Sequence, residues 1–145
     1  MHHKRSRSTL FLIEQLIVIA VFAICAAACA RILTSAYFSA RDARDLSNAI
    51  LAAESSAEIF KASAGDFGKV AEIMGGLSGI VDGSVAAVIY FDSQWLVCGV
   101  DEAYYMLLLI DGAGSAPLLT GELTVENLQT GEEILALTVI TRADT

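Results

Sequence analysis

A single carboxylate interrupts an otherwise apolar stretch near the start of this 145-residue chain. Glu14 lies within residues 10–30, which read LFLIEQLIVIAVFAICAAACA. A carboxylate surrounded by lipid is costly unless it is paired, so an acid at this place is a candidate for contact with a partner cation. The alternatives are that Glu14 only reaches toward the lipid headgroups, or that it pairs with Arg7 of its own chain.

Histidine and cysteine chemistry has little support in the rest of the sequence. His2 and His3 are the only histidines, and both precede the apolar stretch. A Ser-His-Asp triad or a histidine metal site after residue 30 is therefore excluded. Cys25 and Cys29 lie in the apolar stretch and Cys98 stands alone in the rest of the chain, which gives no disulfide framework. We expect no catalytic residue, no enzyme activity, no cofactor and no small-molecule substrate.

We also expect no metal, although four acids near the ends of predicted strands could supply oxygen ligands to Ca²⁺. These acids are Asp92, Asp101, Glu102 and Asp111. Acids at strand ends are more often simply solvated. The glycine-rich run at residues 75–79 lacks the following Lys-Ser/Thr of a phosphate-binding loop.

The charged residues are divided by the apolar stretch. Lys4, Arg5 and Arg7 precede it without an acid, whereas six basic residues and sixteen acids follow it. The acidic part lacks the clustered Lys and Arg that bind nucleic-acid phosphates, so we expect no nucleic acid partner. Because cytoplasmic flanks of membrane spans are enriched in Lys and Arg, the N-terminus is predicted to be cytoplasmic and the C-terminal domain extracytoplasmic.

Residues 10–30 are predicted to form one transmembrane helix in the cytoplasmic (inner) membrane. Twenty-one residues at about 1.5 Å each cover about 31 Å, the thickness of the hydrocarbon core. Eleven Leu, Ile, Val and Phe side chains favour insertion by roughly 3–6 kcal/mol, against at most about 3 kcal/mol for Glu14. Two alternatives stay open: a cleaved secretory signal with Ala28-Cys29-Ala30 at its cleavage site, and a lipoprotein signal with Cys29 at the modified position.

The helix is predicted to continue beyond the membrane, because no Pro or Gly occurs between Leu10 and Lys61. Apolar residues recur at helical spacing and predict an amphipathic extension over residues 31–62. They are Ile32, Ala36, Ala40, Ala43, Leu46, Ile50, Ala53, Ala57 and Phe60. The opposite face is predicted to hold Arg41, Asp45, Asn48 and Ser56. We expect Ile50 and Phe60 to be buried by a sheet; a surface-lying or coiled-coil helix is the alternative.

Turn residues become frequent after the long helix and predict a small extracytoplasmic domain over residues 63–145. A short helix is expected at Phe67–Met74. The strand-like runs are Val85–Phe91, Trp95–Val100, Tyr104–Ile110, Leu119–Asn127 and Glu133–Arg142. Short turns between consecutive strands predict an antiparallel meander. The predicted fold class is α+β: a basic leader at residues 1–9, then a long helix, transmembrane in its first half, packed on a small antiparallel sheet.

The residues around Glu14 resemble the N-terminus of type IV pilins and of the pseudopilins of type II secretion systems. In that family a short basic leader precedes an F-T-L-I-E-type motif, and residues 10–20 here read LFLIEQLIVIA. The resemblance implies a pilin-like fold and a structural subunit of a pilus-like or type II secretion-like filament. It also implies that Glu14 meets the free N-terminal amine of a neighbouring subunit. The paired C-terminal cysteines of many pilins are missing, which favours a pseudopilin or minor pilin.

The candidate processing junction lies between Thr9 and Leu10. The family's peptidase cuts after Gly, sometimes after Ala, so we expect no efficient cleavage after Thr9. Arg7 of the same or an adjacent chain would then replace the amine as the partner of Glu14.

Helix packing is expected along the stripe that contains Glu14, where small and β-branched residues allow close approach of helices in membranes. This helix-packing face is Val18, Val21, Cys25, Cys29 and Ile32. The implied partners are membrane lipid, other pilin-like subunits and the assembly platform. A monomeric single-pass membrane protein with an extracytoplasmic partner-binding domain, and a secreted protein released by signal peptidase, are the alternatives.

Overall fold

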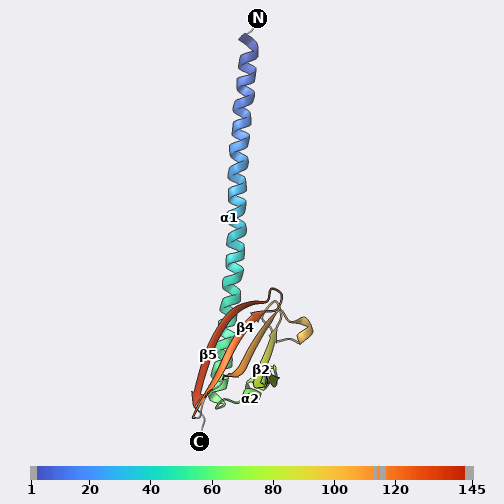
Figure 1. The fold of residues 1–145 in the computed structure, drawn as a ribbon. Coiled ribbons are helices and arrows are strands. Elements are labelled where there is room, and N and C mark those ends of the chain that lie inside the picture. Colours follow the sequence, from blue (N-terminus) through green and yellow to red (C-terminus); the bar gives the residue numbers. More distant parts are fainter. Residues whose placement is uncertain (1–2, 113, 115–116, 143–145) are drawn as a thin grey trace. The chain divides into compact units, whose positions relative to one another are not determined.

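The computed structural model describes residues 3–112, 114 and 117–142 of the chain. In chain order the elements are α1 (His3–Ala62), α2 (Phe67–Met74), β1 (Leu77–Val81), β2 (Ser84–Phe91), the 3-10 turn η1 (Val100–Glu102), β3 (Tyr105–Gly112), β4 (Leu118–Asn127) and β5 (Glu132–Arg142). Figure 1 shows this arrangement as a ribbon. The chain divides into two compact units, Met1–Ala43 and Arg44–Thr145.

The first unit contains the N-terminal part of α1. Every side chain from Thr9 to Ala43 is exposed, including the large apolar side chains of residues 10–30. Exposed apolar surface costs roughly 25 cal/mol per Å² in water, so this part of the helix needs lipid or protein around it. Among the described residues, α1 is long and apolar enough to cross a membrane. The prediction of a long unbroken N-terminal helix is confirmed, although the helix begins at His3 rather than at Leu10.

The second unit contains an antiparallel sheet with the strand order β1-β2-β3-β4-β5. Each strand pairs with its neighbour in sequence; for example, Ile89 lies opposite Leu107, and Leu107 opposite Val125. This is the meander that the short turns predict. The α+β fold class, with a long N-terminal helix packed on an antiparallel sheet, is therefore confirmed.

The C-terminal part of α1, drawn in green in Figure 1, packs on one face of the sheet. The core residues are Ala49, Ala53 and Phe60 of α1, Phe67, Val70 and Ala71 of α2, and Ala87, Ile89, Phe91, Tyr105, Leu107, Leu109, Leu123, Val125 and Val139 of the sheet. Phe60 is fully buried, and its ring centroid lies 5.0 Å from that of Phe67. Burial of each large apolar side chain contributes about 1.5–3 kcal/mol, so this cluster is the main source of the unit's stability.

The buried stripe of α1 differs from the predicted one. It consists of Ala49, Ala53, Ser56 and Phe60, spaced by four, three and four residues. Phe60 is buried as predicted, but Ile50 is 38% exposed, and Ser56, predicted on the opposite face, is 0% exposed. The Ser56 hydroxyl donates to the carbonyl of Ala52 at 2.9 Å, so its burial leaves no unpaired donor. Three of its four residues are small, which lets the helix approach the sheet closely, and Phe60 is the one large side chain among them.

The short helix α2 has the predicted bounds because local signals define both of its ends. The Asp66 side chain accepts a hydrogen bond from the Lys69 backbone N–H at 3.1 Å and caps the N-terminus. Gly75 follows Met74 with a φ of 74°, a left-handed conformation that ends helices.

Four of the five predicted strands correspond to β2, β3, β4 and β5, with ends within two residues. The strand predicted at Trp95–Val100 is wrong. This segment makes an isolated bridge between Phe91 and Val97, and Val100 begins η1. Trp95 has a φ of 64°, which is incompatible with a strand.

The edge strand β1 was not predicted, because Gly75, Gly76 and Gly79 read as a continuous turn region. Asp82 and Gly83 connect β1 to β2 with φ values of 50° and 86°. Two successive positive φ values are typical of the two-residue hairpin turn, and Asp-Gly is one of its preferred sequences. This dipeptide is the signal that could have revealed β1.

Candidate functional site

The predicted packing stripe lies on the exposed surface of the first unit. Glu14 and the five residues of its helix-packing face are all exposed. Three of them, Val18, Val21 and Cys25, line a shallow hollow of about 360 Å³ together with Ile17 and Phe22. Residues three and four apart face the same side of a helix, so the stripe and the hollow belong to one surface. Side chains of a neighbouring helix could enter this hollow.

The candidate processing junction lies inside a helix. Thr9 and Leu10 are both exposed residues of α1, which begins at His3. Proteolytic cleavage is favoured at exposed loops and termini, whereas helical backbone must first open locally. Cleavage after Thr9 would therefore require unwinding of the first turns of α1.

The four acids considered for Ca²⁺ are divided among three places in the second unit. Asp92 follows β2, Asp101 and Glu102 are exposed residues of η1, and Asp111 is an exposed residue of β3. Asp92 Oδ1 accepts hydrogen bonds from the backbone N–H groups of Gln94 at 2.8 Å and of Leu96 at 3.0 Å. Within the described part of the chain, no three His, Cys, Asp or Glu side chains are grouped so that they could hold a metal ion.

Cys98 is a partly buried thiol beside two of these acids. Partial burial, followed by the negative charges of Asp92 and Glu102, raises the pKa of the Cys98 thiol above its ordinary value. The thiol form therefore dominates at neutral pH, which disfavours nucleophilic or redox chemistry at this residue.

The second unit has a groove of about 270 Å³ that the sequence did not reveal. It is lined by Asn48, Leu51, Ala52 and Ser55 of α1, Met74 of α2, Phe91 of β2, and Trp95. Polar and apolar side chains therefore face the same space. A groove of this size and composition suits a side chain or a short peptide segment.

Trp95 is one of the residues that line this groove, and it attaches the segment after β2 to α1. Its ring stacks on Tyr105 with centroids 4.2 Å apart and an interplanar angle of 18°, and it lies 5.7 Å from Phe91. Its Nε1 donates to Asp45 Oδ1 at 3.4 Å. Asp45 and Asn48, predicted to face away from the sheet, are thus half-buried on the side of α1 that meets this segment. The single tryptophan of the chain was the available signal, because buried Trp N–H groups usually have a partner.

No protein-family model, no curated protein and no solved structure matches the chain.

Proposed function

We propose that the chain is a structural subunit of a type IV pilus-like or type II secretion-like filament, a pseudopilin or minor pilin that assembles through its N-terminal helix. The observation that carries the proposal is Glu14, an exposed acid within the apolar, fully exposed part of α1. This segment has the length and composition of a membrane span. In such a setting the carboxylate gains most from a partner cation.

Helix association in lipid depends on close packing and polar contacts, because apolar surface is already solvated by lipid tails. The hollow beside Val18 and Val21 offers the packing surface, and Glu14 offers the polar contact one turn away. Together they favour contact between copies, or with sister pilin-like subunits, over an isolated span.

The proposed location is the cytoplasmic (inner) membrane, with the N-terminus cytoplasmic and residues 31–145 outside. Support comes from Lys4, Arg5 and Arg7 before the span, since such residues stay on the cytoplasmic side. The subunit would rest in the membrane and enter the filament through the assembly platform, without an enzymatic reaction of its own.

Substitution of Glu14 tests this proposal. Glu14→Ala removes the carboxylate from the apolar segment, so membrane insertion should be unchanged or better. Disulfide crosslinking between copies through Cys25 should fall by about tenfold, as expected for a loss of about 1.4 kcal/mol of pairing. Gln15→Ala changes the adjacent exposed residue and should leave both quantities unchanged. Unchanged crosslinking in Glu14→Ala would overturn the assembly role.

The cation that pairs with Glu14 depends on processing. Mass spectrometry of the membrane-extracted protein separates the two cases: a chain that starts at Leu10 offers its new amine, and a chain that retains Thr9 makes Arg7 the partner. We expect the second case, because Thr9 is β-branched and lies inside α1.

A second candidate function is a monomeric single-pass membrane protein whose second unit binds a partner. The groove lined by Leu51, Met74 and Trp95 favours it. The same crosslinking measurement separates the two functions, because a monomer would show no Cys25 crosslink even with Glu14 in place.

A further inference from the structure

The sheet has an outer face, turned away from α1, with an apolar half on β2 and β3 and a half on β4 and β5 that carries carboxylates beside Thr124, Ala136 and the 56% exposed Ile140. Side chains alternate between the two faces of a strand, and residues opposite each other in the register share a face. Because Ile89, Leu107 and Val125 face the core, their neighbours along the strands form the outer face. One cross-strand row of this face is Tyr90, Met106, Glu126 and Glu133, and the next is Val88, Leu108, Thr124 and Ala136.

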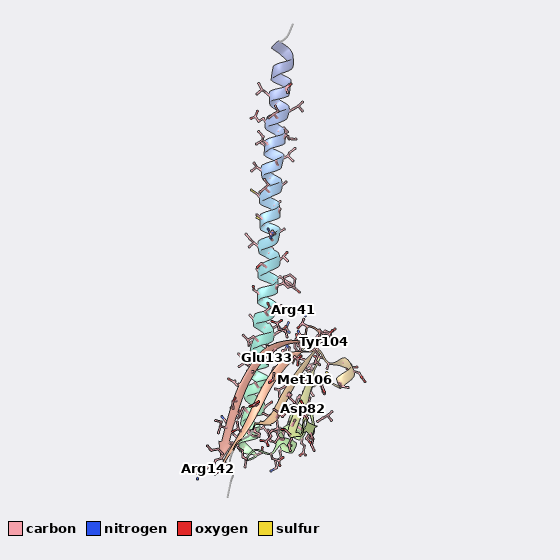
Figure 2. The ribbon with its side chains drawn as sticks, in the orientation of Figure 1. Arg41, Asp82, Tyr104, Met106, Glu133 and Arg142 are labelled. Atoms are coloured by element: carbon pink, nitrogen blue, oxygen red, sulfur yellow. The ribbon has the colours of Figure 1, made fainter. Side chains whose placement is uncertain are left out.

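The apolar half lies on β2 and β3. Tyr90, Met106, Val88 and Leu108 are half-buried there, so each retains apolar surface in contact with solvent. Both helices contribute their buried side chains to the core on the other face of the sheet. Figure 2 labels Met106 in this half and Glu133 in the acidic half.

The acidic half lies on β4 and β5. Glu126 and Glu133 are directly opposite each other, next to the register shift between Val125 and Glu126. Like charges in directly opposite positions destabilise a sheet, by up to about 1 kcal/mol. Glu122, an exposed residue of the same face of β4, adds a third carboxylate. A cationic partner would replace this repulsion by attraction.

The chain itself carries a segment of complementary chemistry in α1. Leu33 is 71% exposed and Tyr37 is 69% exposed, and Arg41 and Arg44 are exposed as well. Spacings of four, four and three residues place these four side chains on one side of a helix. The segment therefore presents apolar groups followed by two cations.

We propose that in the assembled filament the outer sheet face of one copy binds the segment Leu33–Arg44 of a second copy, with Arg41 and Arg44 at Glu126 and Glu133. Arg41 and Arg44 are about 4.5 Å apart along a helix axis, and neighbouring strands are about 4.8 Å apart. Two long Arg side chains can therefore each reach one carboxylate. This inference rests on the proposed function, because it requires contact between copies.

The test uses full-length chains in membranes, in a Cys25→Ala, Cys29→Ala, Cys98→Ala background. One tagged chain carries Ala136→Cys on the outer face, and a differently tagged chain carries Ala40→Cys in the α1 segment. A short bismaleimide should join the two tags. The combined change Glu126→Lys and Glu133→Lys on the first chain should reduce the product by about fivefold or more, because two ion pairs become repulsive. Adding Arg41→Glu and Arg44→Glu to the second chain should restore the product.

Two controls make the result specific. The combined change Glu54→Lys and Glu58→Lys alters charge equally at exposed positions of α1 and should leave the product unchanged. Chains with Cys25 as their single cysteine report span contact independently. If their crosslink persists while the mixed-tag product is missing or fails to recover on charge exchange, the sheet contact is wrong and the filament proposal stands. If both crosslinks are missing, the filament proposal fails as well.

Discussion

Trp95 combines an unfavourable backbone conformation with favourable side-chain contacts. A φ of 64° is rarely adopted by a residue other than Gly, Asn or Asp and costs about 1–3 kcal/mol. The stacking on Tyr105 and the hydrogen bond to Asp45 offset this cost. The segment between β2 and β3 is thereby held against α1, and it carries Cys98 into the neighbourhood of two carboxylates.

The pH dependence of Cys98 alkylation checks this description of its surroundings. Because partial burial and the nearby carboxylates raise the pKa of its thiol, the reactive thiolate should form at higher pH than in an unfolded Cys peptide. In a Cys25→Ala, Cys29→Ala chain, the rate of iodoacetamide reaction should therefore rise with pH and reach half its plateau above the peptide's midpoint. Glu102→Gln should move this midpoint to lower pH, and Glu54→Gln should not. A midpoint equal to or below the peptide's would contradict the assignment.

At the scale of elements, the junction between α2 and β1 depends on close approach of the backbone to β2. A Cβ atom on Gly76 would overlap the carbonyl oxygen of Val88 and would come within 2.7 Å of Ile89 Cγ1. A Cβ atom on Gly79, which lies within β1, would meet nothing within 4 Å. Gly76 is therefore needed for close backbone approach and Gly79 is not, although both belong to the same glycine-rich run at residues 75–79.

Alanine substitution should separate these two glycines. Gly76→Ala should lower the free energy of unfolding by about 1–3 kcal/mol, because backbone cannot yield as a flexible side chain does. Gly79→Ala should change it by less than about 0.5 kcal/mol. Urea unfolding of the detergent-solubilised chain, followed by Trp95 fluorescence, measures both. Equal effects of the two substitutions would show that β1 does not approach β2 as described.

The elements could be predicted from sequence where local chemistry defines them. Asp66 and Gly75 specify both ends of α2, and apolar runs bounded by turn residues indicate β2 to β5. The buried stripe of α1 could not be predicted from hydropathy, because close packing on the sheet selects Ala and Ser over Ile50. The groove could not be predicted either, since its lining comes from three separate segments of the chain, brought together by tertiary packing. Glu14, by contrast, could be singled out from the sequence as a candidate assembly residue, because the apolar residues around it are contiguous in the chain.

At the scale of the whole molecule, charge differs strongly between the units. Residues 1–43 carry five basic residues and two acids, whereas residues 44–145 carry four basic residues and fifteen acids. An acidic unit gains solubility from its net charge, and in the proposed orientation the basic residues before Leu10 remain on the cytoplasmic side, where Lys and Arg are enriched. The acidic charge of residues 44–145 and the basic charge before Leu10 both favour the proposed orientation, with the N-terminus cytoplasmic.

This orientation can be measured by labelling an engineered cysteine in intact cells. Gln129 is exposed in the turn between β4 and β5, so Gln129→Cys in a Cys25→Ala, Cys29→Ala, Cys98→Ala chain should react with a membrane-impermeant maleimide. Ser6→Cys, before the span, should react only after lysis. Labelling of Gln129→Cys only after lysis would place the second unit in the cytoplasm and would overturn the proposed location.

The order of strands in the sheet has a consequence for biosynthesis. Because every strand pairs with the strand before it in the chain, the contacts of the sheet are local in sequence, which favours rapid folding. The helix that covers the core is made first, so each hairpin can dock on α1 as soon as it is synthesised and delivered. Unpaired strands are then short-lived, so an incomplete sheet has little opportunity to aggregate with other copies during synthesis.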